Sequence, residues 1–314
     1  MFGKRMRSTL ALGIVTLMLC AGLCTAEAAD WPTKTITFIY HSKAGSGGDM
    51  FLRALGKAME KDLGESIIVD NKPGAAGMNA WKPASRARDG HTFLGVSSTV
   101  ITSPILNNLP ITYKTFKPVA MMFVDPMILF VHKDKPWNSI EEFVADAKQN
   151  PGKYNIAGGV PGELGFVAGM LLMQEAGIKI NIVPFESGVD AAVSVLGGHI
   201  DGAIGEYGEA SSQIEGGDLK VLVGFNPVEG TSIRTVQDAG YNIEIEKFRG
   251  LLAPPDTSPE AIARISAACQ KALEDPDFKQ YYQNMKLVPI FKTGEKFTQV
   301  MANQDTQIKK FMAQ

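Results

Sequence analysis

Apolar residues occur along the chain as short runs that alternate with longer amphipathic stretches. The run TITFIY at 35–40 is compact and rich in β-branched and aromatic residues, which is typical of a strand. Over 49–63 the apolar side chains recur three and four positions apart, which is typical of a helix with one buried face. Because this alternation continues along the chain, the pattern predicts a parallel α/β fold.

Strand-like runs fall into an early and a central group, followed by one late strand. The early runs are 35–40, 66–70 and 91–96. The central runs are 126–132, 154–158, 180–185, 201–205 and 219–225, with helices predicted at 139–150, 164–176 and 190–196. The last stretch predicts a strand at 248–254 and helices near 259–273, 276–285 and 295–312.

The first 28 residues have the three parts of a secretory signal peptide. Three basic residues within the first seven positions precede an apolar run at about 10–23, and Ala26-Glu27-Ala28 supplies small residues before a cut after Ala28. The apolar run is too short to span a bilayer, so we expect export to the periplasm. Two of the three cysteines would leave with the peptide, and because Cys269 alone remains, no internal disulfide is expected.

The charge of the chain narrows the classes of partner. Its formal net charge at pH 7 is −2, and loss of the basic leader would make the exported protein more acidic. Nucleic acids and anionic membranes attract basic surfaces, so we expect neither as a partner.

A glycine-rich loop, HSKAGSGGD at 41–49, connects the first predicted strand to the first predicted helix. Ser46-Gly47-Gly48-Asp49 has the spacing of a capping box, in which the Ser46 hydroxyl and the Asp49 carboxylate each accept a backbone N–H. Such a loop leaves N–H groups and the positive end of the helix dipole facing open space, which suits a carboxylate or a phosphate. A structural tight turn is the alternative for this loop taken alone.

Three further loops favour the binding interpretation, because each follows a predicted strand. They read SSTVITSP, AGGVPGELG and FESGVDA. The carboxyl ends of parallel strands meet at one edge of a sheet, so two domains facing each other there would enclose a cleft.

Nucleotide binding and catalysis have little support in the sequence. The glycine loop has Met50 where G-x-G-x-x-G needs its third glycine, and no P-loop motif occurs. The four histidines are scattered, no G-x-S-x-G motif is present and no spacing suggests a metal site. We therefore expect no catalytic residue, metal or cofactor, although His41 lies in the glycine loop itself.

The chain resembles the extracytoplasmic solute-binding proteins of tripartite tricarboxylate transporters. The resemblance extends over essentially the whole chain after the leader and is carried by WPTKTITFIYHSKAGSGGD, DNKPGAAGMNA with RARDGHTFL, NPGKYNIAGG, VPFESGVDAAVSVLGGHID and FRGLLAPPDTSPEAIARI. It implies two α/β lobes joined by crossing strands that close on a ligand like a flytrap. It also implies a small organic acid whose carboxylates meet loop N–H groups, hydroxyls and bridging waters.

The predicted lobes draw on separate stretches of the chain, because a late strand with helices often completes the first domain. Lobe 1 would comprise 29–132 and 227–314, and lobe 2 would comprise 133–226. The chain would cross near 130–134 and return near 225–229, and residues 248–314 would pack on lobe 1.

Several residues depart from the usual pattern of the family and bear on the ligand. His41-Ser42-Lys43 stands where Pro-Phe-Pro is usual. The other departures are Glu163 and Phe166 for Ser and His, Glu186 for Lys, Ser187 for Gly, Asp190 for Pro, and the added acid Glu206. The acids gained outnumber the base gained. We therefore expect a ligand with a carboxylate at one end and a neutral or cationic group at the other, rather than a polyanion such as citrate.

Loops of both lobes would supply the ligand site. The complete candidate set is Ser42, Lys43, Ala44, Gly45, Ser46, Asp49, Ser98, Thr99, Gly159, Val160, Phe185, Glu186, Ser187, Gly188, Val189 and Glu206. A cap or a turn is the alternative role for Ser98 and Thr99, and a helix cap is the favoured role for Asp49. Lys43 has three open roles: counter-ion of the ligand, partner of an acid that latches the lobes, or solvated surface lysine.

The sequence thus predicts a monomeric periplasmic solute-binding protein that is not an enzyme. It would capture a small organic acid or an amino-acid-like ligand and deliver it to the permease subunits of a membrane transporter. Two other classes remain open: a sensor module that presents the ligand to a signalling receptor, and a secreted enzyme that acts on a small acid.

Overall fold

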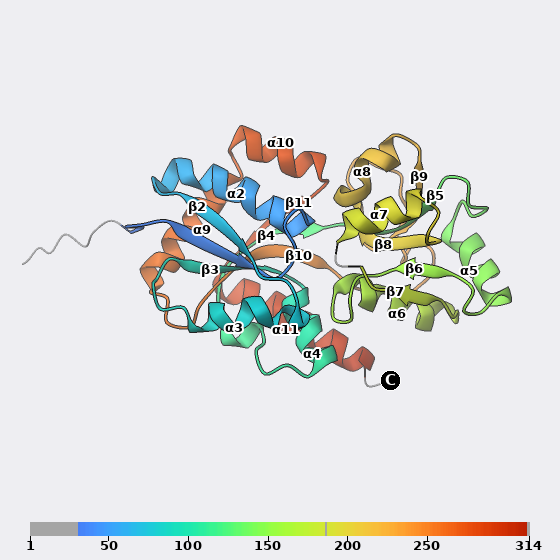
Figure 1. Cartoon of the computed structure of the whole chain (residues 1–314), viewed down its shortest axis with the longest axis horizontal. Coiled ribbons are helices and arrows are strands. Elements are labelled where there is room, and N and C mark those ends of the chain that lie inside the picture. The colour runs from blue at the N-terminus through green and yellow to red at the C-terminus, as the bar shows by residue number, and fades with distance from the viewer. Residues whose placement is uncertain (1–30, 186, 313–314) are drawn as a thin grey trace, which may run out of the picture.

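The structure, a computed structural model, describes residues 31–185 and 187–312. The predicted signal peptide and its cleavage after Ala28 lie outside the described residues. Figure 1 shows two lobes side by side, each with a central sheet between helices, so the predicted α/β class is confirmed. Across the described ranges, no helix is both long and apolar enough to cross a membrane.

Lobe 1 is built from both ends of the described chain. Its elements are β1 (Ile36–Tyr40), α2 (Gly47–Leu63), β2 (Ile67–Asn71), η1 (Ala75–Gly77), α3 (Met78–Arg86), β3 (Thr92–Ser97), α4 (Thr99–Asn107), η2 (Tyr113–Thr115), β4 (Lys117–Asp125), β10 (Lys247–Ala253), α9 (Pro259–Ala272), α10 (Pro276–Asn284), β11 (Val288–Lys292) and α11 (Gly294–Met312). The strand order is β11-β4-β10-β3-β1-β2. Helices α2, α9 and α10 cover one face, and α3, α4 and α11 cover the other.

Lobe 2 is built from the middle of the chain. Its elements are β5 (Met127–His132), α5 (Ile140–Gln149), β6 (Asn155–Ala157), α6 (Leu164–Ala176), β7 (Asn181–Val183), α7 (Gly188–Leu196), β8 (Gly202–Glu206), α8 (Tyr207–Glu215) and β9 (Leu219–Gly224). The strand order is β7-β6-β8-β5-β9. Helices α5 and α6 pack on one face of this sheet, and α7 and α8 pack on the other.

The chain first passes between the lobes at Pro126, earlier than the predicted crossing near 130–134. β4 belongs to the sheet of lobe 1 and ends at Asp125, whereas β5 pairs with β8 and β9 in the sheet of lobe 2. The run 126–132 was therefore assigned to the wrong lobe. Its apolar pattern identifies a strand, but such a pattern does not identify the sheet in which the strand pairs.

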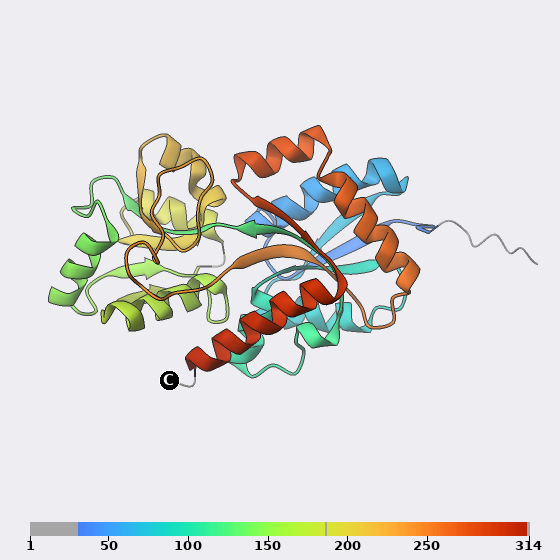
Figure 2. The same ribbon diagram turned by 180° about the vertical axis from the view of Figure 1, so that it is seen from behind.

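The chain returns to lobe 1 at Lys247, later than the predicted return near 225–229. Phe225, Ile243 and Ile245 are buried in the core that β5, α5 and α6 share, so residues 225–245 remain with lobe 2. β10 then enters the lobe 1 sheet between β3 and β4. Figure 2 shows α9, α10 and α11 on lobe 1, with α11 running toward the junction of the lobes.

Gly250 permits the close approach of β10 to β4. A Cβ atom at this position would overlap the carbonyl oxygen of Ala120 and lie 3.1 Å from Cα of Met121. The strand pairing is irregular between Arg249 and Gly250. Glycine is therefore required here to hold the strand that crosses from one lobe to the other.

We predict that Gly250→Ala lowers the free energy of unfolding by about 1–3 kcal/mol, because the new methyl group would collide with backbone atoms. Gly205→Ala is the matched control, since Gly205 also lies in a strand and its nearest neighbour, Cε1 of Phe130, would be 4.0 Å from the new Cβ. Urea unfolding followed by circular dichroism measures both variants. Equal stabilities would contradict the close approach at Gly250.

Candidate functional site

A cleft between the lobes holds three cavities. The largest, of about 340 Å³, is lined by the loops 41–43, 73–77 and 160–163 together with Thr99, Ser103 and Asn107. Two smaller cavities, of about 50 and about 40 Å³, adjoin it. Glu163 lines all three, so the cavities form one continuous cleft.

The glycine-rich loop brings the start of α2 to this cleft, but its capping differs from the prediction. Ser46 is the N-cap residue, yet its side chain makes no cap hydrogen bond. Oδ2 of Asp49 instead accepts the N–H of Gly45 at 2.8 Å, and Asp49 pairs with Arg53 one turn later. The predicted capping box is therefore wrong for Ser46, whose buried hydroxyl has no hydrogen-bond partner among the residues that the structure describes.

A carboxylate from lobe 2 meets the first residue of α2. The N–H of Gly47 donates to Oε1 of Glu209 at 2.7 Å, although 162 positions separate the two residues. Burial raises the pKa of Glu209 to about 7, while the charge of Arg249 and the Gly47 hydrogen bond lower it. The positive end of the helix dipole thus faces an acid of the protein itself.

Two buried basic residues of β10 extend into the same region. Arg249 pairs with Asp125, and their side chains are 3% and 1% exposed. Lys247 pairs with Glu206 across the two lobes. Burial lowers the pKa of Lys247 to about 8, and the positive charge of Arg249 lowers it further. Ion pairs of this kind satisfy the buried charges that the cleft requires.

His41 follows β1 directly and lines two of the cavities. Its ring lies 4.6 Å from that of Tyr40 and 6.1 Å from that of Trp81, measured between centroids. Burial lowers the pKa of His41 to about 3, and the charges of Lys247 and Arg249 act in the same direction. His41 is therefore neutral at physiological pH.

The loop 73–77 lines the largest cavity and was not among the predicted site residues. Gly74, Ala75, Ala76 and Gly77 have φ angles of 100°, 48°, 53° and 97°. Left-handed backbone costs a non-glycine residue about 1–2 kcal/mol, so the two alanines are strained. The hydroxyl of Ser103 donates to the carbonyl of Ala76 at 2.8 Å and helps to hold this loop.

The loop 159–163 closes the cleft from lobe 2. The hydroxyl of Thr102 donates to the carbonyl of Gly162, and Nδ2 of Asn107 donates to the carbonyl of Pro161 at 3.2 Å. Gly162 has a φ of 104°, and a Cβ atom there would lie 2.7 Å from the Ser103 hydroxyl. The two lobes are thus in direct contact at this end of the cleft.

The structure brings most of the predicted set to the cleft. Its cavities are lined by Ser42, Lys43, Ser46, Thr99, Gly159, Val160, Phe185, Ser187, Gly188 and Glu206. Five others line none of the three cavities, namely Ala44, Gly45, Asp49, Ser98 and Val189. Glu186 lies outside the described residues. Ser98 is the N-cap residue of α4, but its side chain makes no cap hydrogen bond: its hydroxyl donates to the carbonyl of Glu246 at 2.8 Å and accepts the N–H of Phe248.

Several cleft residues were missed. They are the loop 73–77, Ser103, Asn107, Pro161, Gly162, Glu209, Lys247 and Arg249. The pair of glycines that brackets Ala75 and Ala76 was a usable signal, since such spacing is typical of a left-handed turn. No local pattern marks Glu209 on α8 or Arg249 on β10, because each reaches the cleft through contacts with distant parts of the chain.

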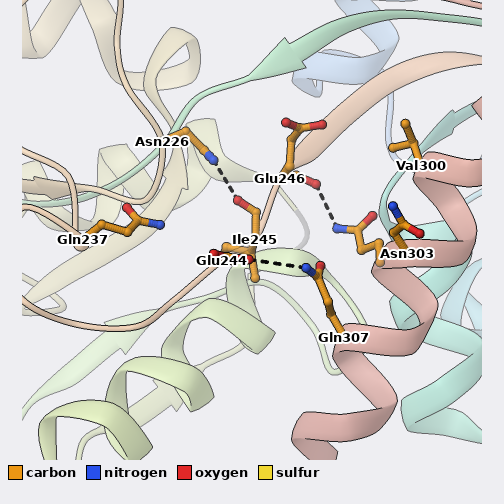
Figure 3. A pocket seen from close by; sticks show the side chains of 9 residues that line it. Asn226, Gln237, Glu244, Ile245, Glu246, Val300, Asn303 and Gln307 are labelled. Carbon is orange, nitrogen blue, oxygen red and sulfur yellow. Dashed lines mark hydrogen bonds between the residues drawn. The ribbon is translucent and has the colours of Figure 1, made fainter.

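A separate pocket of about 370 Å³ lies at the junction of the lobes, beside α11. Figure 3 shows amide side chains directed at the segment that returns from lobe 2. Nδ2 of Asn226 donates to the carbonyl of Ile245 at 2.7 Å, and Nε2 of Gln304 donates to that of Glu246 at 2.9 Å. This pocket shares no lining residue with the three cleft cavities.

Comparison with known proteins agrees with this geometry. The model of the family described as tripartite tricarboxylate transporter family receptor matches residues 51–314. The chain is 26% identical over 307 residues to the UPF0065 protein in the gbd 5′ region of Cupriavidus necator, with 94% of this chain and 92% of that protein covered.

Solved structures give the same result for the fold. A TctC solute-binding protein from Polaromonas, solved with no ligand, is 30% identical, with a TM-score of 0.70 and with 90% of this chain and 99% of that chain covered. MatC from Rhodopseudomonas palustris, solved with bound malate, is 21% identical, with a TM-score of 0.80 and with 89% of this chain and 99% of that chain covered. The two-lobe periplasmic-binding-protein architecture is thereby confirmed.

The buried state of His41 predicts a specific loss of stability in acid. Its pKa is lower in the folded chain than in the unfolded chain, so the unfolded chain takes up the proton first and stability falls as the pH drops from about 6.5 toward 3. Replacing the ring by the neutral amide in His41→Asn removes this contribution, which amounts to at most ~1.4 kcal/mol per pH unit. Thermal unfolding at pH 7, 5.5 and 4 should show the wild type losing more stability than the variant. Parallel pH profiles would contradict the assignment.

Proposed function

We propose a function from one premise: the chain belongs to the tripartite tricarboxylate transporter receptor family. It is a periplasmic solute-binding protein of that family. Its finer role, in our proposal, is to capture a small carboxylate compound between its lobes and deliver it to the membrane subunits of a tripartite tricarboxylate-type transporter. The observation that carries this proposal is the continuous cleft, which loops of both lobes line and close.

The size and lining of the cleft support a small ligand. A cavity of about 340 Å³ falls at the lower end of the range for small-molecule sites. Hydroxyls of Ser42, Thr99 and Ser103 and the amide of Asn107 line it, and these groups bind polar ligands without reacting with them. The malate bound to MatC supports a carboxylate as the anchoring group, although at 21% identity the particular acid is not transferred.

The balance of charges supports an amino-acid-like ligand over a polyanion. Lys247 and Arg249 are already paired with Glu206 and Asp125. Glu163 and Glu209 add two further acids to the cleft. In our proposal the ligand carboxylate lies beside the hydroxyls of the largest cavity, which Lys43 also lines, while the other end of the ligand meets acids and favours a neutral or cationic group.

Native mass spectrometry of the protein purified from the periplasm tests the proposal, since a retained ligand reveals its mass. A thermal-shift screen of carboxylates and amino acids complements it. A ligand that binds only the folded state adds about 2.7 kcal/mol at a hundredfold excess over its Kd, so a true ligand produces a clear shift. If no carboxylate raises the melting temperature, the proposal fails, and turnover of the ligand during incubation would instead indicate an enzyme.

Lys43 provides a residue-level prediction. A charge-assisted contact in a desolvated cleft contributes ~1.5–3 kcal/mol, whereas a surface pair contributes ~0–1 kcal/mol. We expect Lys43→Met to weaken ligand binding about ten- to a hundredfold, measured by isothermal titration calorimetry. Lys57→Met is the control, because Lys57 is an exposed lysine of α2 that lines none of the cleft cavities. An unchanged Kd in Lys43→Met would assign Lys43 to the solvated surface.

A further inference from the structure

We propose that Glu209 is a specificity-determining residue: its carboxylate fills the place between α2 and α7 where a second ligand carboxylate would otherwise bind. The protein thereby selects ligands that present a neutral or cationic donor at this point. This inference rests on the proposed function and names the residue that sets its ligand class.

The geometry places the Glu209 carboxylate between the first residues of two helices, one from each lobe. Its Oε1 accepts the N–H of Gly47, the first residue of α2. Its Oε2 lies against Gly188, the first residue of α7, so closely that a Cβ atom there would overlap it. Helix starts carry free N–H groups and partial positive charge, so together they form a place suited to one carboxylate.

Arg249 of lobe 1 lies beside the same helix start as the Glu209 carboxylate. A Cβ atom on Gly47 would lie 2.8 Å from Nη2 of Arg249 and 2.8 Å from Oε1 of Glu209. The guanidinium and the carboxylate therefore flank the same backbone position. Because the Glu209 side chain already occupies it, an incoming anion would have to displace that side chain.

One oxygen of Glu209 retains free hydrogen-bonding capacity. Oε2 is buried and has no hydrogen-bond partner in the part of the chain that the structure describes. A buried acceptor without a donor is costly, so this atom favours a ligand that brings an N–H or O–H group. A ligand carboxylate would bring a second acceptor instead.

The neighbouring charges disfavour a second anion as well. Asp125 and Glu163 raise the pKa of Glu209 in addition to the larger effect of burial, and Arg249 opposes them. The remaining base nearby, Lys247, is paired with Glu206. The acidic side chains around Glu209 therefore already balance the positive charge of the nearby bases, so a second ligand carboxylate would add uncompensated negative charge.

The test compares two probes of equal backbone length, succinate and 4-aminobutyrate, by calorimetry at pH 8, above the pKa of about 7 to which burial raises Glu209. We expect the wild type to prefer 4-aminobutyrate by at least tenfold. Glu209→Ser should change the ratio of the two Kd values at least tenfold in favour of succinate, with Glu209→Gln between them. Glu215→Gln is the matched control, since Glu215 is exposed at the end of the same helix α8, and should leave the ratio unchanged.

A second measurement does not require an organic ligand. Removing the Glu209 side chain exposes both helix starts and Arg249, so sulfate should raise the melting temperature of Glu209→Ser more than that of the wild type, on which it has only its general stabilising effect. If sulfate does so while no carboxylate shifts either protein, Glu209 fills an anion-binding place as inferred, and it is the proposed function that fails. If Glu209→Ser only lowers stability, with the ligand ratio and the sulfate response both unchanged, Glu209 is a structural brace and the inference is overturned.

Discussion

The buried ion pair of Arg249 and Asp125 fixes the junction on which both lobes depend. Asp125 ends β4 one residue before the first crossing, and Arg249 lies near the start of β10, just after the second. Their pairing therefore ties the two crossing segments together at the base of the cleft. Truncating one partner of such a pair leaves an uncompensated buried charge, at a typical cost of ~3–5 kcal/mol.

The same pair determines the chemistry of the cleft. Because Asp125 neutralises Arg249, the guanidinium can lie beside the start of α2 without attracting a free anion as strongly as an unpaired arginine would. Lys247, two residues earlier on β10, is neutralised in turn by Glu206 of lobe 2. The basic side chains of the cleft thus pair with acidic side chains of the protein. In the proposed complex, the ligand would contact hydroxyls, backbone groups and the remaining carboxylates.

Much of the fold follows from local patterns, whereas the centre of the site does not. The spacing of Phe51, Leu55 and Met59 predicted α2, and Gly64 ends it with a φ of 74°. Strand patterns alone could not place the crossing at Pro126, since adjoining apolar runs on either side of it pair in different sheets. The loops were located by their positions after predicted strands, and the family match confirms the resemblance that implied a ligand between the lobes.

The acids and bases that meet in the cleft were harder to anticipate for a topological reason. Glu209 was missed because α8 shows no sequence feature that directs a carboxylate toward a helix 162 positions away. Lys247 and Arg249 lie in a strand whose alternation predicts burial of one face but not the lobe junction. The positions of these side chains relative to the cleft depend on the order of the strands in the two sheets, which local sequence patterns do not specify.

The contacts on the two sides of the junction differ in the parts of the chain that they join. On the cleft side, the lobes meet through side chains that contact the opposite lobe, such as Asn107 with Pro161 and Glu209 with Gly47. At the junction, the returning segment is held from both lobes by Asn226 and Gln304, whose amides bind neighbouring carbonyls (Figure 3). Opening must break the first set, but it can keep the second if the backbone bends at the two crossings. Any separation of the lobes would therefore bend the backbone at the two crossings, beside the ion pairs of Arg249 with Asp125 and of Lys247 with Glu206.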